Sequence, residues 1–328
     1  MHALKFVTAI LLIFLVGMSH ITQANETAMP QQAVLVTGAS SGIGKRIAET
    51  LAQRGVFVYA GARKERDLEV LNQQKNMQGV RLDVTMPEDI NAAVEMIQQQ
   101  GKHLHGIVNN AGVFAYAPMI EVSERDLAFQ FNVNVYGPYR MSKAFAPLLI
   151  KNQGRIVNIG SIAGLRSNKM FGPYSMSKFA VEAMTEAMAA ELAKFDMSVS
   201  VIEPGNFNSN IMQNMKKRQA ELTHNADATL FADEYQSMQG FTKTDRSTHA
   251  DPQPVADAVI DALFSAQPKL RYLVTPNDGE ARYAVGSVIE KLVQINNDHR
   301  HTIADADLIA MLEAELKKAN AHNASEDN

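Results

Sequence analysis

The sequence contains no cysteine and no tryptophan among its 328 residues. The lack of cysteine excludes disulfide bonds, thiolate metal ligands and cysteine nucleophiles, and it leaves the cellular compartment open. There is also no excess of positive charge. The formal net charge of -4 gives no electrostatic reason to expect a nucleic-acid partner.

Histidine is present but is not arranged to bind a metal. The closest pairs among the nine histidines are His103 with His105 and His299 with His301. Neither pair has the i, i+4 helical spacing or the added carboxylate that is typical of a zinc site. We therefore expect no metal site.

A long apolar run occurs at the start of the chain. Lys5 precedes the run from Phe6 to Met18, and Gln23-Ala24 follows it, which is the pattern of a signal peptide. As a helix the run spans about 20 Å, which is short for a bilayer core of about 30 Å. Extended through Ile21, it would suit an uncleaved anchor. We expect residues 1–24 to export the chain or associate it with a membrane. A local core helix in a cytoplasmic protein is the alternative.

Beyond this segment, hydrophobic residues make up 46% and charged residues 20% of the chain, as in soluble globular proteins. Short apolar runs alternate with longer amphipathic ones. The predicted strands are residues 33–37, 56–60, 80–82, 106–108, 155–159, 198–203 and 271–274. The predicted helices are residues 43–53, 66–74, 87–99, 123–151 with a break near Gly137-Pro138, and 174–195. This alternation predicts an α/β fold with a doubly wound, parallel, seven-stranded sheet, which is a Rossmann fold.

Three regions follow from this pattern. We expect the Rossmann-fold domain to occupy residues 32–275, and its polar, methionine-containing stretch 206–250 to cap a substrate site. Helical patterns at 280–295 and 304–318 predict that residues 276–328 form a helical C-terminal extension.

A glycine-rich turn joins the first predicted strand to the first helix. Its candidate cofactor-binding residues are Thr37, Gly38, Ser40, Ser41, Gly42, Ile43 and Gly44. Glycines allow a tight turn and close approach of a pyrophosphate, and the following helix offers free N–H groups to the phosphates. The spacing is T-G-x-x-x-G-x-G, without the G-K-S/T of a P-loop. A turn without a ligand is the alternative.

The end of the second strand bears on which dinucleotide would bind. A carboxylate there would hold ribose hydroxyls and favour NAD. The chain instead has Arg63 and Lys64, cations that could bind a 2′-phosphate, so we favour NADP with NAD as the alternative. Arg63 could also stack on adenine or cap a surface turn.

Tyr174 and Lys178 form a Y-x-x-x-K pattern at the start of a predicted helix. Positions i and i+4 share a helix face, and an ammonium near a phenol favours the phenolate, which predicts a lowered pKa for Tyr174. Such a group can donate a proton to a carbonyl or accept one from an alcohol. Ser161, thirteen residues earlier, follows the fifth strand and could hold the substrate oxygen. A turn serine that bonds its own backbone is the alternative.

Two asparagine segments complete the pattern. Asn109-Asn110-Ala111-Gly112 ends the fourth strand, and Val133-Asn134 lies in the long helix before the fifth. Together with the glycine turn, Ser161 and Y-x-x-x-K, their order over about residues 33–274 resembles the short-chain dehydrogenase/reductase family. The later helices resemble the branch that contains hydroxysteroid and retinol dehydrogenases.

The resemblance implies an NAD(P)-dependent oxidoreductase acting on CH–OH or C=O groups. It implies that Tyr174 is the acid/base, that Lys178 lowers its pKa and binds the nicotinamide ribose, that Ser161 orients the substrate oxygen, and that Asn134 supports a proton relay. It further implies cofactor contacts by Asp83, Val84, Asn110, Ala111, Gly112, Pro204, Gly205, Phe207 and Ser209. Ser209 stands where the family usually has threonine but keeps the hydroxyl. Asp83 could instead cap the helix that begins near Pro87.

Other functions have less support. A non-catalytic dinucleotide-binding regulator would be expected to lose the tyrosine or the lysine, and an epimerase or dehydratase on this fold usually has a different glycine spacing. Candidate pocket walls are Phe114, Tyr116, Leu165, Met170, Phe171, Met212 and Met215. They favour an apolar steroid-, retinoid- or lipid-like small-molecule substrate, with ordinary capping hydrophobicity as the alternative. The resemblance also implies a homo-oligomer formed through the long helices.

Overall fold

The computed structural model describes residues 31–221, 229–243 and 249–326. The predicted signal peptide or anchor at residues 1–24 lies outside these residues. In the described part of the chain, no helix combines the length and the apolarity needed to cross a bilayer.

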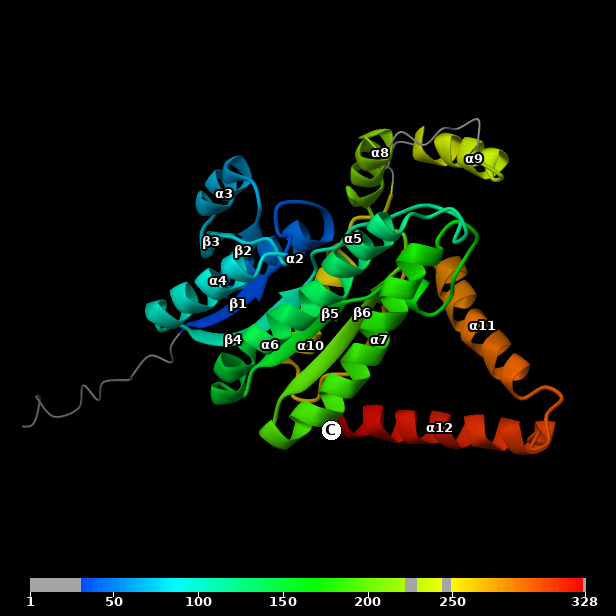
Figure 1. Ribbon diagram of the computed structural model, residues 1–328. Coiled ribbons are helices and arrows are strands. Elements are labelled where there is room, and N and C mark those ends of the chain that lie inside the picture. Colours follow the sequence, from blue (N-terminus) through cyan, green and yellow to red (C-terminus); the bar gives the residue numbers. More distant parts are fainter. Residues whose placement is uncertain (1–30, 222–228, 244–248, 327–328) are drawn as a thin grey trace, which may run out of the picture.

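One sheet of seven parallel strands organises the molecule, in the order β3-β2-β1-β4-β5-β6-β7 (Figure 1). The strands are β1 (Gln32–Val36), β2 (Phe57–Ala62), β3 (Met77–Arg81), β4 (His103–Asn109), β5 (Arg155–Ile159), β6 (Ser198–Pro204) and β7 (Arg271–Val274). The predicted doubly wound, seven-stranded fold is therefore confirmed. All carboxyl ends of the strands lie at one edge, where this fold binds its ligands.

Helices cover both faces of the sheet, which is why the strands are continuous apolar runs. One apolar core lies under α2 (Gly42–Gln53), α3 (Glu65–Asn72) and α10 (Gln253–Phe264). The other lies under α4 (Pro87–Gln100), α5 (Glu124–Asn134), α6 (Tyr136–Lys151) and α7 (Gly172–Leu192). Short 3-10 turns occur at η1 (Ile162–Gly164) and η2 (Ala193–Phe195). Helix α10 is not among the helices predicted from the sequence.

The long helix predicted over residues 123–151 is divided as expected, but at Val135, slightly before Gly137-Pro138. Pro138 falls in the first turn of α6, where a missing N–H costs little. Because Pro138 has no N–H, it cannot donate the i+4 helical hydrogen bond to the carbonyl of Asn134.

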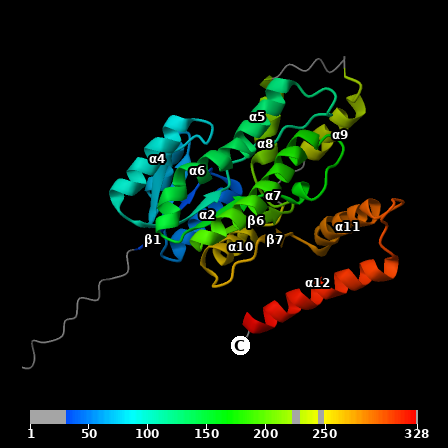
Figure 2. The ribbon, with the colours of Figure 1, turned by 60° about the horizontal axis from the view of Figure 1, so that its bottom comes forward.

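Residues 206–250, predicted to cap the site, contain α8 (Ile211–Glu221) and α9 (Ala232–Lys243). Beyond β7 the chain forms α11 (Asp278–Ile295) and α12 (Asp305–Glu326). Figures 1 and 2 show α11 leading away from the sheet and α12, after one bend, running back toward the body of the molecule.

Candidate active site

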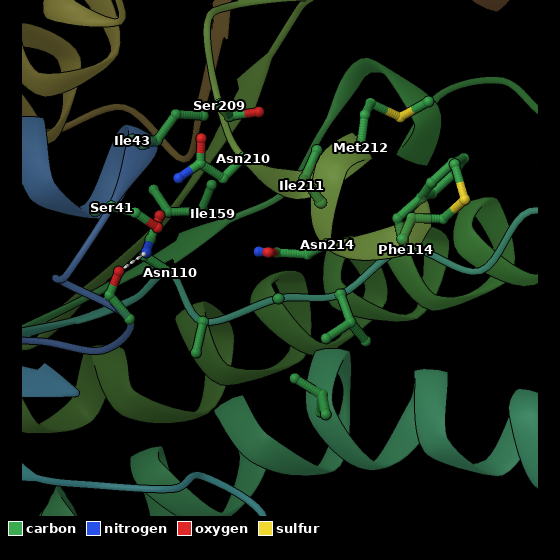
Figure 3. Close-up of a pocket in the computed structure, with 18 of the residues that line it drawn as sticks. Ser41, Ile43, Asn110, Phe114, Ile159, Ser209, Asn210, Ile211, Met212 and Asn214 are labelled. Atoms are coloured by element: carbon green, nitrogen blue, oxygen red, sulfur yellow. Dashed lines mark hydrogen bonds between the residues drawn. The ribbon is translucent and has the colours of Figure 1, made fainter. Parts of the chain in front are cut away.

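A continuous cavity of about 1250 Å³ runs along the carboxyl edge of the sheet. It brings together segments that lie far apart in the sequence. Figure 3 shows Ser41 and Ile43 from the glycine turn, Asn110 from the end of β4, and Met212 from α8 around the same space. Every residue predicted to contact cofactor or substrate oxygen lines this cavity, except Thr37 and Asn134. These two lie behind its wall.

The glycine turn has the geometry that only glycine adopts without strain. Gly38 and Gly42 have φ of 66° and 56°, in the left-handed region. A Cβ on Gly44 would lie 2.2 Å from Asn110 Nδ2 and 2.4 Å from the carbonyl oxygen of Gly38. Helix α2 begins here with no side-chain cap at Ser41 and no acidic residue in its first turn. Its N–H groups and positive dipole end are therefore suited to an anion such as a phosphate.

Thr37 and Asn110 join the glycine turn to β4. Thr37 Oγ1 accepts hydrogen bonds from the backbone N–H groups of Asn110 and Ala111, both at 2.9 Å. Asn110 Nδ2 donates to the carbonyl oxygens of Thr37 and Gly38, at 2.8 and 3.3 Å. Thr37 thus holds the glycine turn to the end of β4 from behind the cavity wall.

Arg63 and Asp83 line the same cavity near the ends of β2 and β3. The Arg63 guanidinium is 3.5 Å from Asp83 Oδ2, and 60% of its side chain is exposed. Asp83 Oδ1 accepts hydrogen bonds from the backbone N–H and the hydroxyl of Thr85. Burial alone would raise the pKa of Asp83, but the Thr85 hydrogen bonds and the Arg63 charge outweigh burial and lower it. Asp83 does not cap α4, which begins after Met86.

Tyr174, Ser161 and Lys178 meet where the cavity passes β5. Ser161 Oγ accepts a hydrogen bond from the N–H of Ala163 at 3.1 Å and also hydrogen-bonds Tyr174. Lys178 Nζ donates to the carbonyl oxygen of Ile159 at 2.7 Å and lies 5.6 Å from the centre of the Tyr174 ring. Helix α7 supplies two of these groups from one face, and the turn after β5 supplies the third.

The pKa of Tyr174 differs from the prediction made from the sequence. Burial raises the pKa of Tyr174 to about 12, and the hydrogen bond with Ser161 opposes this only in part. Burial lowers the pKa of Lys178 to about 8, against the attraction of Glu182. The predicted lowering of the Tyr174 pKa by Lys178 is therefore wrong for these contacts, because the ammonium is bonded to Ile159 rather than to the phenol.

Asn134 acts together with a residue that the sequence analysis missed. Its Nδ2 donates to the carbonyl oxygen of Val113 at 2.9 Å and to Ser177 Oγ at 3.1 Å, and its Oδ1 accepts from the Val113 N–H. Gln130, one turn earlier on α5, donates to the same carbonyl and accepts from the Ala115 N–H. The two buried amides hold the loop after β4 beside α7. Their i, i+4 spacing was a signal that could have identified Gln130.

A second group missed by the sequence analysis lies one turn beyond Lys178. Glu182 on α7 and Glu203 on β6 are buried, and they lie close enough for each carboxyl group to shift the pKa of the other. Arg271 Nε, from β7, lies 3.2 Å from Glu182 and 3.4 Å from Glu203. A Cβ on Gly160 would lie 2.9 Å from Glu182 Oε1. The network therefore fixes α7 against the turn that carries Ser161.

This network predicts a pH dependence of stability. Burial and the neighbouring Glu182 raise the pKa of Glu203 from 4.5 to about 8. Between these values the folded protein holds a proton that the unfolded chain releases, so stability falls as the pH rises from about 4.5 to about 8. We expect Glu203→Gln to flatten this fall in urea unfolding experiments. Glu186→Gln, at the exposed carboxylate beside Arg271, is the matched control. An unchanged slope in Glu203→Gln would contradict the assignment.

Aromatic and methionine side chains form the substrate half of the cavity. Phe114, Met212 and Met215 are buried together and pack against Tyr116, Phe171 and Tyr174. The ring of Phe114 meets that of Tyr174 edge-on, with centres 4.9 Å apart. Tyr116, Leu165 and Met170 do not line the cavity. In the described part of the chain, no group of histidine and acidic side chains is arranged to hold a metal ion.

Comparisons with known proteins agree with this geometry. The family model for the short chain dehydrogenases matches residues 32–220. An uncharacterized oxidoreductase, YbbO of Escherichia coli (strain K12), is 33% identical over 270 residues, which cover 80% of this chain and 94% of that protein. An NADPH-dependent 3-dehydrocapnine reductase of Ornithobacterium rhinotracheale is 32% identical, covering 74% of this chain and 87% of its own.

Among solved structures, a short-chain dehydrogenase from Streptomyces avermitilis superimposes with a TM-score of 0.66 and 28% identity. The match covers 88% of this chain and 98% of that one. The chain belongs to the short-chain dehydrogenase family, and it is an oxidoreductase of that family.

Proposed function

We propose that this protein is an NADP-dependent reductase or dehydrogenase that interconverts a carbonyl and an alcohol on an apolar small molecule. One observation carries the proposal. A single cavity joins the glycine turn to the half-buried phenol of Tyr174 and hydroxyl of Ser161 and to the buried ammonium of Lys178, and then continues into an aromatic pocket.

The residues present fit a nicotinamide dinucleotide. The uncapped start of α2 and the glycine turn suit its pyrophosphate. Asp83, Arg63 and Lys64 surround the end of the cavity that would hold its adenosine half, and Lys178 lines the part that would hold its nicotinamide ribose. When bound, such a cofactor supplies or accepts the hydride. The NADPH dependence of the Ornithobacterium reductase supports the same choice of cofactor.

The chain's own residues handle the proton. The pKa of about 12 keeps Tyr174 protonated at neutral pH, so the phenol can donate a proton to a carbonyl oxygen as negative charge develops there. Ser161 can hold that oxygen beside the phenol. Lys178, with its pKa near 8, is largely cationic at neutral pH, and its ammonium would stabilise the phenolate left behind on leaving the carbonyl oxygen of Ile159. In the reverse direction the phenolate would accept the alcohol proton.

The proposal is tested by titrating the full-length protein with NADPH and NADH and then measuring turnover of ketones with increasing alkyl length. We expect tighter binding of NADPH. We also expect kcat/KM to rise by roughly fourfold for each buried methylene, because each contributes about 0.8 kcal/mol. Failure to bind either dinucleotide would refute the cofactor assignment, and a preference for short polar ketones would refute the apolar pocket.

Arg63 gives a separate prediction. Arg63→Ser should raise the Kd for NADPH by about tenfold and leave that for NADH nearly unchanged, because only NADPH carries the 2′-phosphate that the guanidinium would bind. Arg54→Ser is the matched control, since Arg54 is also exposed and also lies 3.5 Å from one carboxylate, Asp257. Equal loss of both dinucleotides, measured by fluorescence titration, would show that Arg63 does not discriminate between them.

A further inference from the structure

The charged side chains that line the cavity are distributed unevenly. Among the described residues they are Arg63, Lys64, Arg66, Asp67, Asp83, Arg125, Arg166, Lys178, Lys217 and Arg218. Both carboxylates belong to the group near the ends of β2 and β3. In the described part of the chain, the three cations supplied by α5 and α8 share their part of the cavity wall with no carboxylate. This part of the cavity is therefore suited to an anion.

Arg218, on α8, is held in place with unused hydrogen-bond donors. Figure 3 shows Asn214, one turn earlier on the same helix, extending into the cavity. Arg218 Nη2 donates to Oδ1 of the buried Asp126 at 3.0 Å, and the guanidinium lies 3.4 Å from the centre of the Phe129 ring. The other nitrogens of this guanidinium make no hydrogen bond to any residue that the structure describes. A fixed, planar guanidinium with free N–H groups is suited to bind a carboxylate or a phosphate at two points.

Arg125 and Lys217 add positive charge beside Arg218. Arg125 Nε lies 4.0 Å from the Asp126 oxygen that accepts the hydrogen bond from Arg218, so one carboxylate stands between two guanidinium groups. Lys217 is exposed, lines the cavity and makes no ion pair with the residues described. Because one carboxylate neutralises only one of three cations, this end of the cavity keeps a net positive charge that an anionic ligand would balance.

This cationic end is separated from the catalytic groups by an apolar stretch of wall. Arg125, Phe129 and Val133 follow each other at i, i+4 and i+8 on α5, and all three line the cavity. Val133 directly precedes Asn134, which is hydrogen-bonded to Ser177 beside the catalytic groups of α7. With a rise of 1.5 Å per residue, Arg125 lies about 12 Å further along the helix axis than Val133.

The phosphates of a dinucleotide do not need the three cations of α5 and α8. The pyrophosphate suits the uncapped start of α2, and a 2′-phosphate suits Arg63 and Lys64 at the opposite end of the cavity. The cationic end is therefore available to another anion, and the substrate is the ligand that reaches this side of Tyr174.

We propose, building on the proposed function, that the substrate carries an anionic group, a carboxylate or a phosphate, which Arg218, Arg125 and Lys217 bind between α5 and α8. The substrate is then an amphipathic oxo acid or hydroxy acid. Its carbonyl or alcohol lies beside Tyr174, and an apolar chain of about 12 Å joins that group to the anion.

Binding of decanoate and of decanol to the full-length protein in the presence of NADPH tests the site without turnover. We expect decanoate to bind about tenfold more tightly in titration calorimetry, because its charge strengthens the hydrogen bonds that the guanidinium donates. Arg218→Lys keeps a cation beside Asp126 but loses the planar fork, so it should reduce this preference. Arg125→Gln/Lys217→Gln changes two exposed side chains, and its combination with Arg218→Lys should remove most of the preference.

Arg81→Gln is the matched control. Arg81 is exposed and lies 3.4 Å from Asp89, but it does not line the cavity, so the preference for decanoate should stay at the wild-type value. Equal binding of decanoate and decanol by the wild type would refute the anion site. Weaker NADPH binding by the combined variant, with the decanoate preference unchanged, would assign the cations to the cofactor instead.

Turnover separates this site from the proposed function. We expect kcat/KM to be about tenfold higher for a long-chain methyl ketone that ends in a carboxylate than for its methyl ester, for the same electrostatic reason. Preferential binding of decanoate without reduction of any ketone would keep the anion site and refute the proposed function. Reduction of both ketones at equal rates, with decanoate and decanol bound equally, would keep the proposed function and refute the anion site.

Discussion

Tyr174→Phe should lower kcat by about 10²–10⁴-fold, the range expected when a general acid is removed, while NADPH binding stays largely intact. The phenol is the proton-bearing group that reaches the same part of the cavity as Ser161 and Lys178. The phenylalanine ring keeps the edge-on contact with Phe114, whose centre is 4.9 Å away. Single-turnover kinetics and a dinucleotide titration would measure the two effects separately.

Tyr139→Phe is the matched control, because it removes a phenolic hydroxyl from a half-exposed ring on α6. It should change neither quantity. Turnover by Tyr174→Phe close to the wild-type rate would remove Tyr174 from the role of acid. Loss of NADPH binding along with turnover would instead indicate that the hydroxyl supports the cofactor site.

Gly44→Ala should nearly abolish dinucleotide binding and destabilise the fold by about 3 kcal/mol, the upper part of the usual range for overpacking. The added Cβ would lie 2.4 Å from the carbonyl oxygen of Gly38 and 2.2 Å from Asn110 Nδ2. Neither can yield easily, because the same amide nitrogen holds the glycine turn to β4. Urea unfolding and NADPH titration would measure the two losses.

Gly286→Ala should have the opposite effect on the free energy of unfolding. Gly286 lies within α11, and a Cβ there would meet nothing within 4 Å. We expect a gain of about 0.5–1 kcal/mol from the higher helix propensity of alanine. If Gly44→Ala were no more harmful than Gly286→Ala, the close packing of the turn would have no functional consequence.

Local patterns in the sequence were sufficient to predict most of the strands of the sheet. β5 and β7 begin and end at the predicted residues because both are short apolar runs between polar segments. β4 begins earlier than predicted, at His103, because pairing with β1 extends it. Helix α10 was missed although Val255, Val259 and Leu263 repeat at i, i+4 and i+8. It sits between the cap and β7, where the alternation of strands and helices had already been interrupted.

The site could be predicted where its residues lie at the carboxyl ends of parallel strands. Ser161 and Asn110 could be placed at one edge because β5 and β4 must both finish there. The pKa of Tyr174 could not be predicted, because it depends on how deeply the phenol is buried and on which acceptor Lys178 takes. Arg271 contacts Glu182 from 89 positions further along the chain, and no local pattern reports such a contact.

That long separation has a consequence during synthesis. A nascent chain that has emerged only as far as Gly205 already contains the glycine turn, Ser161, Tyr174 and Lys178, but it lacks the guanidinium between Glu182 and Glu203. Two facing carboxyl groups without that cation resist burial. Helix α7 is therefore expected to dock fully only after the ribosome has released β7, so that an incomplete chain would hold every motif of the enzyme without an assembled catalytic centre.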